Sequence, residues 1–242
     1  MQDNQQQAYD RGITIFSPDG RLYQVEYARE AVERGSATVG VRTPSGVVLA
    51  ADRRARSPLI ERDSIEKIHA VDDHVAVASA GHVADARQLV DFARRQAQLD
   101  QLRYDEAIGV ETLTKRVTDH IQQYTQTGGA RPFGVALLVA GVENGEPRLF
   151  ETDPSGTPYE WQAVAIGGGR EEMQSFLEEE YRAEMDLSGG VDLALEALAA
   201  DAEVDAAGVN VVTVDVESGS VDPLSDDEVA AHVEELGLGG EE

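Results

Sequence analysis

The chain has 242 residues, of which 46 are acidic and 20 are basic, and its formal net charge is −26. Such a surplus of carboxylates repels phosphate groups, which disfavours nucleic acid and an anionic membrane surface as partners. Cysteine is absent, and its absence excludes disulfides, thiolate nucleophiles and cysteine metal sites.

The first third of the chain predicts one helix and two hairpins. Residues 17–20 (Ser-Pro-Asp-Gly) have the composition of a tight turn. Apolar residues at three- and four-residue steps then predict a short amphipathic helix over about residues 20–34, ending at Gly35. Apolar strands separated by turn residues predict hairpins of 38–42 with 47–51 and of 67–71 with 74–80.

The rest of the chain alternates between helical and strand patterns. The predicted elements are helices 83–102 and 104–124, strands 133–142, 148–151 and 163–166, helices 171–182 and 191–200, a hairpin of 209–214 with 220–221, and a last helix capped by Ser225. Because the strands are grouped in hairpins, antiparallel sheets are expected. We therefore predict an α+β fold in which stacked sheets carry helices on their outer faces.

The acidity is concentrated in the last part of the chain. Residues 170–242 hold 22 acidic residues against only Arg170 and Arg182. One interpretation is a disordered acidic tail. Apolar residues still recur through this segment, which favours a folded surface adapted to a very salty cytosol, where charge repulsion is screened over short distances. Only residues 237–242 are then expected to be disordered.

Generic catalytic motifs identify no active site. The turn Gly167–Gly169 has the composition of a phosphate cradle, but Glu171 and Glu172 would repel an anion and no P-loop lysine follows. A close strand-to-helix connection is therefore the preferred interpretation. The five histidines lack metal-ligand spacing, and no Gly-x-Ser-x-Gly elbow is present. We predict no cofactor and no metal.

A series of sequence blocks resembles the α-type subunits of archaeal 20S proteasomes, and the acidic composition favours the haloarchaeal ones. The first block is residues 9–32, which begins Tyr-Asp-Arg-Gly-Ile-Thr-Ile-Phe-Ser-Pro-Asp-Gly. The others are 35–40 (Gly-Ser-Ala-Thr-Val-Gly), 64–68 (Ser-Ile-Glu-Lys-Ile), 81–87 (Gly-His-Val-Ala-Asp-Ala-Arg), 131–134 (Arg-Pro-Phe-Gly), 153–157 (Asp-Pro-Ser-Gly-Thr) and 165–169 (Ala-Ile-Gly-Gly-Gly). The resemblance spans about residues 8–183 with compatible spacing.

This resemblance implies a four-layer αββα sandwich of the N-terminal-nucleophile hydrolase type, in agreement with the order of the predicted elements. The resemblance and the composition together predict three parts: a flexible gate segment 1–12, a single domain 13–236 and an acidic, disordered tail 237–242. The implied function is that of a non-catalytic ring subunit with a gated channel and a docking surface for a regulatory ATPase, active in the degradation of intracellular proteins.

The alternative within the same fold is a catalytic β-type threonine peptidase or another N-terminal-nucleophile hydrolase. Such relatives use an amino-terminal Thr whose own amine is the base. The matching residues 35–38 (Gly-Ser-Ala-Thr) follow 34 others, so their backbone nitrogens are amides. Asp52 and Lys67 occupy the positions of the acid and the lysine of such a site, but they have no terminal nucleophile to serve.

The resemblance assigns the gate to the N-terminal segment. Tyr9, Asp10 and Arg11 match the gate motif of archaeal α subunits, and Pro18 and Tyr27 match residues that hold the open gate. A polar, Gln-rich segment buries little apolar surface and can change its order at low cost. The alternatives are an anchored core aromatic for Tyr9 and a packed helix residue for Tyr27.

The resemblance assigns the activator pocket to three further residues. Lys67 matches a lysine that pairs with the C-terminal carboxylate of an ATPase tail ending in hydrophobic-Tyr-any, and an ammonium in a pocket suits a lone carboxylate. Gly35 and Gly81 match small residues that flank this pocket. The alternatives are a surface salt bridge of Lys67 with Glu66, and simple turn geometry for the two glycines.

The implied partners are neighbouring α subunits in a seven-membered ring, catalytic β-type subunits, an AAA ATPase and unfolded proteins in transit.

The N-terminus has no basic and apolar signal regions, and the longest apolar run, residues 135–142, is much shorter than the roughly 20 residues of a spanning helix. A cytoplasmic location is expected. A free-standing acidic binding protein is the third class of function, and it would be a monomer.

Overall fold

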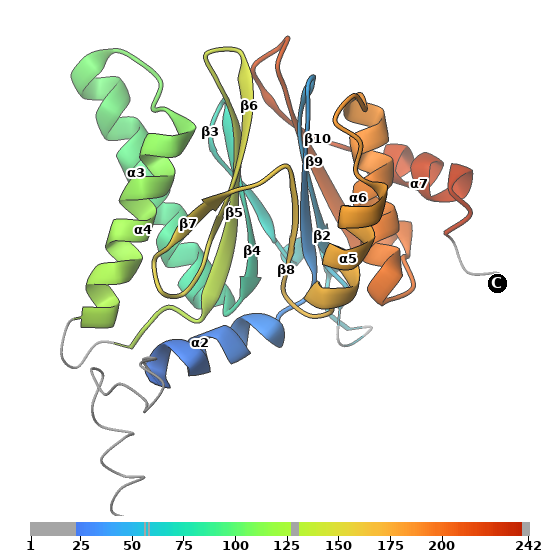
Figure 1. Cartoon of the computed structure of the whole chain (residues 1–242), viewed down its shortest axis with the longest axis horizontal. Helices are drawn as coiled ribbons and strands as arrows, with labels where there is room; N and C mark the ends of the chain where they lie inside the picture. Colours follow the sequence, from blue (N-terminus) through green and yellow to red (C-terminus); the bar gives the residue numbers. More distant parts are fainter. Residues whose placement is uncertain (1–22, 56, 58, 127–130, 239–242) are drawn as a thin grey trace, which may run out of the picture.

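Two five-stranded antiparallel sheets face each other between two layers of helices (Figure 1). The computed structural model describes residues 23–238 except 56, 58 and 127–130. The strand order is β10-β9-β2-β1-β8 in one sheet and β3-β4-β5-β6-β7 in the other. Helices α3 and α4 cover the second sheet, and α5, α6 and α7 lie on the side of the first. The four-layer αββα sandwich predicted from the sequence is confirmed.

The bounds of the elements are as follows. The first sheet contains β1 (Thr38–Thr43), β2 (Gly46–Asp52), β8 (Ala163–Ile166), β9 (Val209–Asp215) and β10 (Val221–Pro223). The second contains β3 (Ile68–Asp72), β4 (Val75–Gly81), β5 (Val135–Glu143), β6 (Glu146–Thr152) and β7 (Pro158–Glu160). The helices are α2 (Tyr23–Glu33), α3 (Val83–Tyr104), α4 (Val110–Gln126), α5 (Arg170–Glu180), α6 (Leu187–Asp201) and α7 (Asp226–Glu235), with 3-10 turns at Arg62–Ser64 and Ala206–Gly208.

Alternation along the strands builds three apolar cores. In β4, Val75 and Val77 pack under α3 and α4, whereas Ala76, Ala78 and Ala80 point between the sheets. Successive strand side chains face opposite sides, so a strand buried on both faces reads as a continuous apolar run. The third core lies between the first sheet and helices α5 to α7.

Three features differ from the sequence prediction. The helix expected from residue 104 begins at Val110, because Asp105 takes a left-handed conformation (φ 56°) and ends α3. Helix α6 begins at Leu187, four residues before the predicted start, and the side chain of its cap Asp186 accepts a hydrogen bond from Gly189 N. The short strand β7 was not predicted, and it pairs with β6 at one edge of its sheet.

Helix α2 lies across one end of the sandwich and packs on β4 and β5 (Figure 1). Its apolar residues Val25, Ala28 and Val32 are buried at the predicted three- and four-residue spacing.

At the other terminus, Gly237 and Leu238 close α7 with backbone bonds to Glu234 O and Val233 O. These two residues of the predicted disordered tail therefore belong to the folded body, and 239–242 lie outside the described residues. None of the helices within the described ranges has the length and apolar character needed to span a bilayer.

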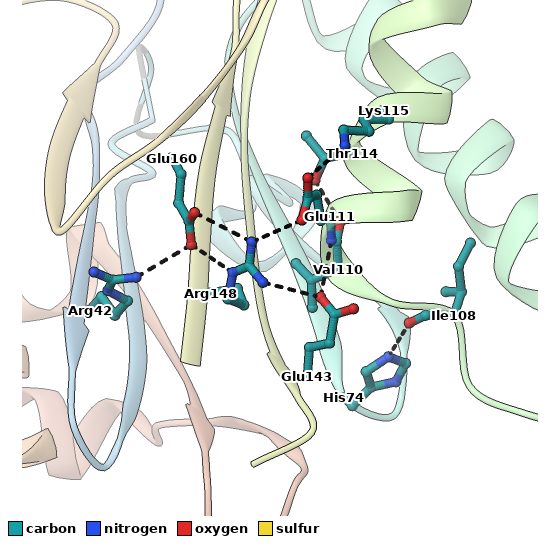
Figure 2. A network of polar contacts seen from close by, with 10 residues as sticks. All are labelled: Arg42, His74, Ile108, Val110, Glu111, Thr114, Lys115, Glu143, Arg148 and Glu160. Carbon is teal, nitrogen blue, oxygen red and sulfur yellow. Dashed lines mark hydrogen bonds and ion pairs between the residues drawn. The ribbon is translucent and has the colours of Figure 1, made fainter. Parts of the chain in front are cut away.

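An ion-pair network joins the helix layer to both sheets at the other end of the sandwich from α2. Figure 2 shows Arg148 of β6 between Glu160 of β7, Glu111 of α4 and Glu143 of β5, at 2.6, 3.2 and 3.7 Å. Glu160 also pairs with Arg42 of β1 at 3.3 Å. One guanidinium thus connects three elements of the same half of the molecule, and Glu160 extends the connection to the other sheet.

Candidate functional site

A groove of about 860 Å³ opens beside α2 and brings together four of the residues selected from the sequence. Tyr27, Gly35, Lys67 and Gly81 all line it. We call it the Lys67 groove. Its other lining residues are Glu30, Ala31, Arg34, Ser36, Arg54, Ile60, Ile65, His82 and Val83.

Lys67 lies just before β3 and its side chain is almost completely buried, with 5% of its surface exposed. Its carbonyl accepts a hydrogen bond from Ser79 N at 3.1 Å, which fixes its backbone to β4. Burial lowers the pKa of Lys67 from 10.5 to about 8, partly offset by the charge of Asp52. Within the described part of the chain, no carboxylate forms an ion pair with its ammonium, and Lys67 is one of the residues that line the groove.

The surface salt bridge of Lys67 with Glu66 is not formed. Glu66 Oε2 lies 3.6 Å from His69 Nδ1 instead. Because Lys67 is buried and Glu66 is exposed, the two adjacent side chains point into different environments.

The two predicted glycines form the floor where α2 meets the sheet. A Cβ on Gly35 would collide with the backbone nitrogen of Gly81, and a Cβ on Gly81 (φ 119°) would collide with Gly134 O. Gly35 O also accepts a hydrogen bond from Gly168 N at 2.8 Å. Turn geometry alone does not explain these glycines, because they allow backbones to touch at the edge of the groove.

Tyr27 projects from the outer side of α2, with 54% of its surface exposed. One turn further, Glu30 and Arg34 form an ion pair at 3.4 Å on the same rim. Exposure at this level does not fit a residue packed on the body of the domain. The remaining gate candidates, Tyr9, Asp10, Arg11 and Pro18, lie outside the described residues.

The residues at the positions of a catalytic site are engaged in structural contacts. Thr38 is fully buried in β1, and its hydroxyl donates to Ser79 O at 3.2 Å. The Asp52 carboxylate accepts from the Arg54 side chain at 2.7 to 3.0 Å and from its backbone nitrogen at 2.8 Å. Neither group is placed to activate a nucleophile.

The three-glycine turn is filled by a side chain of the domain, and two of the histidines make contacts within the domain. A Cβ on Gly169 would collide with the Asp201 carboxylate, so the turn is occupied by a side chain of the same domain. His120 stacks on Phe92 with ring centroids 4.1 Å apart, and His232 Nδ1 lies 2.6 Å from Asp192 Oδ1. Among the residues described, no group of three acidic or histidine side chains could hold a metal ion.

Sequence reasoning missed a buried clamp behind the groove. The carboxylate of Asp85, in the first turn of α3, accepts hydrogen bonds from Nη1 and Nη2 of Arg131 and from the Gly134 amide. Both partners lie in blocks quoted for the family resemblance, 81–87 and 131–134, but nothing in either block alone indicates that they meet across 46 positions.

Comparisons with known proteins agree with this architecture. A family model for proteasome subunits matches residues 32–216, and a model for the N-terminal signature of A-type proteasome subunits matches residues 9–31. The chain is 74% identical to the alpha 2 proteasome subunit of Haloarcula marismortui over 244 residues, which cover 100% of both chains. It is 68% identical to the alpha 1 proteasome subunit of Haloferax volcanii, covering 95% of this chain and 92% of the relative. The alpha proteasome subunit of Natronomonas pharaonis is 67% identical, with coverage of 97% and 93%. The chain therefore belongs to the proteasome subunit family, as an alpha-type subunit of the haloarchaeal kind.

Proposed function

We propose that this chain forms the gated entrance of a cytoplasmic 20S proteasome and that its Lys67 groove receives the C-terminal tail of a regulatory ATPase. As an alpha-type subunit, the chain is a non-catalytic component of a peptidase complex. Seven copies would form the ring on which catalytic β-type subunits assemble, and unfolded proteins would pass through its centre.

The observation that carries the docking proposal is that the largely buried side chain of Lys67 lines an open groove. Burying a cation without a carboxylate partner costs stability, and this cost is recovered when an anion binds. A chain terminus carries one carboxylate, which can pair with this cation. Apolar side chains of the rim, Ile60 and Val83, offer contacts for the hydrophobic residue of a tail ending in hydrophobic-Tyr-any.

The test of docking uses the two lysines of the chain as a matched pair. Lys67→Ala should abolish the stimulation of peptide hydrolysis by the ATPase or by a synthetic tail peptide, in particles shown by electron microscopy to be assembled. Lys115 is exposed on α4 and pairs only with Glu111 in the described part of the chain. Lys115→Ala should therefore respond like the wild type, and a normal response of Lys67→Ala would refute the docking proposal.

The gate is tested by truncation. Removal of residues 2–12 should raise peptide hydrolysis by the assembled particle without loss of ring formation, since the polar segment that closes the channel would be absent. An unchanged rate would contradict a gate made of Tyr9, Asp10 and Arg11. The full-length mass of 26.1 kDa in assembled particles is expected, whereas a catalytic β-type subunit would have lost its first 34 residues or so.

A further inference from the structure

We propose that Asp85 and Arg131 are positioning residues that hold one wall of the Lys67 groove in its docking geometry. This inference rests on the proposed docking function. Neither side chain lines the groove; they act through the backbone of Gly134 and His82.

The clamp itself is a buried carboxylate with three donors. Arg131 Nη2 lies 2.7 Å from Asp85 Oδ1, and Nη1 lies 2.8 Å from Oδ2. The Gly134 amide donates to the same Oδ2 at 2.8 Å. Burial raises the pKa of Asp85, but the hydrogen bonds from Arg131 and Gly134 outweigh it, so the pKa is lowered and the carboxylate stays charged. Paired guanidinium donors also fix direction, which a single contact does not.

The clamp is connected to the groove by the backbone. Gly134 O accepts from His82 N at 2.9 Å, and His82 is the residue before α3 and a lining residue of the groove. A Cβ on Gly134 would lie 2.6 Å from the His82 ring and 3.2 Å from the Ala31 Cβ. A Cβ on Gly81 would collide with Gly134 O, so the Gly81 backbone also lies close to this carbonyl. Movement of residues 131–134 would therefore also move His82, Gly81 and the surface on which Ala31 of α2 packs.

This arrangement predicts an effect on affinity. Arg131 is accessible, with 64% of its side chain exposed, so its loss removes the two clamp bonds without opening a core cavity. Arg131→Ala should raise the half-maximal concentration of a tail peptide roughly tenfold, the equivalent of one charge-assisted hydrogen bond. The maximal stimulation at saturating peptide should be retained, because Lys67 is still present. Arg131→Lys restores one contact of the two and should lie between.

The control is another partly exposed arginine that pairs with a largely buried carboxylate. Arg116 Nη1 lies 2.7 Å from Asp100 Oδ1, between α3 and α4 and away from the groove. Arg116→Ala should leave the half-maximal concentration unchanged. A tenfold weakening in this control as well, or a loss of maximal stimulation in Arg131→Ala, would show a general structural role and overturn the proposal.

The experiment also separates the two proposals. A synthetic peptide ending in hydrophobic-Tyr-any is titrated into assembled particles that carry wild-type, Arg131→Ala, Arg131→Lys, Arg116→Ala or Lys67→Ala subunits. If Lys67→Ala abolishes stimulation but Arg131→Ala responds like the wild type, the clamp is wrong and docking stands. If Lys67→Ala responds normally, docking itself fails, and the clamp proposal falls with it.

Discussion

The carboxylate of Asp52 is held by Arg54, whose Nη2 lies 2.7 Å from Oδ2 and whose Nε lies 3.0 Å from both carboxylate oxygens. In a catalytic relative, the acid and the lysine at these positions would serve a nucleophile. Here Arg54 forms an ion pair with the acid, Asp52, and Asp52 acts on Lys67 only through its charge. Lys67 is thereby left to line the groove, as the proposed docking function requires.

The first prediction concerns the pH dependence of docking. The pKa of Lys67 is about 8 in the free protein, and a bound carboxylate raises it further. The affinity for a tail peptide should therefore be constant below pH 8 and fall about tenfold per pH unit above it. Fluorescence anisotropy of a labelled peptide on α rings, between pH 7 and 9.5, measures this directly.

Lys67→Arg supplies the control for that measurement, because a guanidinium does not titrate in this range. Tyr27, Glu30, Arg34, Arg54 and His82 also face the groove and are unchanged in the variant. The affinity of Lys67→Arg for the tail peptide can differ from that of the wild type at pH 7, but it should not change with pH. A decline equal to that of the wild type would assign the titration to another group.

The second prediction is that Lys67 costs stability. Its pKa falls from 10.5 when unfolded to about 8 when folded, a difference of roughly 3 kcal/mol that disfavours the folded state at pH 7. The unfolded state binds the proton more tightly, so the free energy of unfolding should rise between pH 8 and 10.5. Lys67→Met keeps the volume and removes the charge.

This variant should unfold at a higher temperature than the wild type at pH 7, while losing its response to the tail peptide. The stability difference should shrink as the pH approaches 10. Differential scanning calorimetry of purified rings tests both statements. An equal or lower melting temperature at pH 7 would mean that the ammonium is well stabilised in the folded chain.

The third prediction concerns the backbone contact below the groove. Gly81→Ala places a Cβ against Gly134 O at a φ of 119°, so the strain and the overlap should cost about 2–4 kcal/mol. Gly219 also has a positive φ, 64°, but a Cβ there meets nothing within 4 Å. Gly219→Ala should therefore cost only about 1 kcal/mol. Denaturation of the two variants, side by side, compares a glycine whose Cβ position is occupied with one whose Cβ position is open. Equal losses would contradict the close contact.

The fold was predictable from the sequence wherever local pattern and tertiary packing agree. The continuous apolar runs of β2 and β4, which are buried on both faces, and the three- and four-residue steps in α2 identify these elements directly. The start of α6 was placed too late because Gly189 and Gly190 weaken the helical pattern, although Asp186 caps the helix before them. Strand β7 carries exposed residues only, so no alternation marks it.

The residues of the candidate site could be selected only through the family resemblance. Spacing alone did not distinguish Lys67 from any other lysine, because its burial depends on strands and loops that are distant in the sequence. The clamp of Asp85 and Arg131 could not be predicted for the same reason, because its partners are 46 residues apart in the sequence. Pairs of this kind follow from the topology and not from any local motif.

The last prediction concerns the network of Figure 2. Arg148→Met removes the cation between Glu160, Glu111 and Glu143, whose carboxylates would then repel one another. The Glu143 carboxylate lies beside Gly109, just before α4, and accepts a hydrogen bond from Glu111 N at 3.4 Å, which keeps it near Glu111. The loss should be about 1–2 kcal/mol in dilute salt, since Arg148 is partly exposed, and smaller in molar salt, where the repulsion is screened.

Arg182→Met is the matched control. Arg182 is 63% exposed, and its nearest carboxylate in the described chain, that of Glu180, is 3.9 Å away. Its removal should change the melting temperature little at either salt concentration. Thermal unfolding of both variants in dilute and in molar potassium chloride is the measurement. A loss for Arg148→Met that does not depend on salt would mean that the contact of its guanidinium with the Phe150 ring, 5.1 Å from the guanidinium carbon to the ring centroid, matters more than the ion pairs.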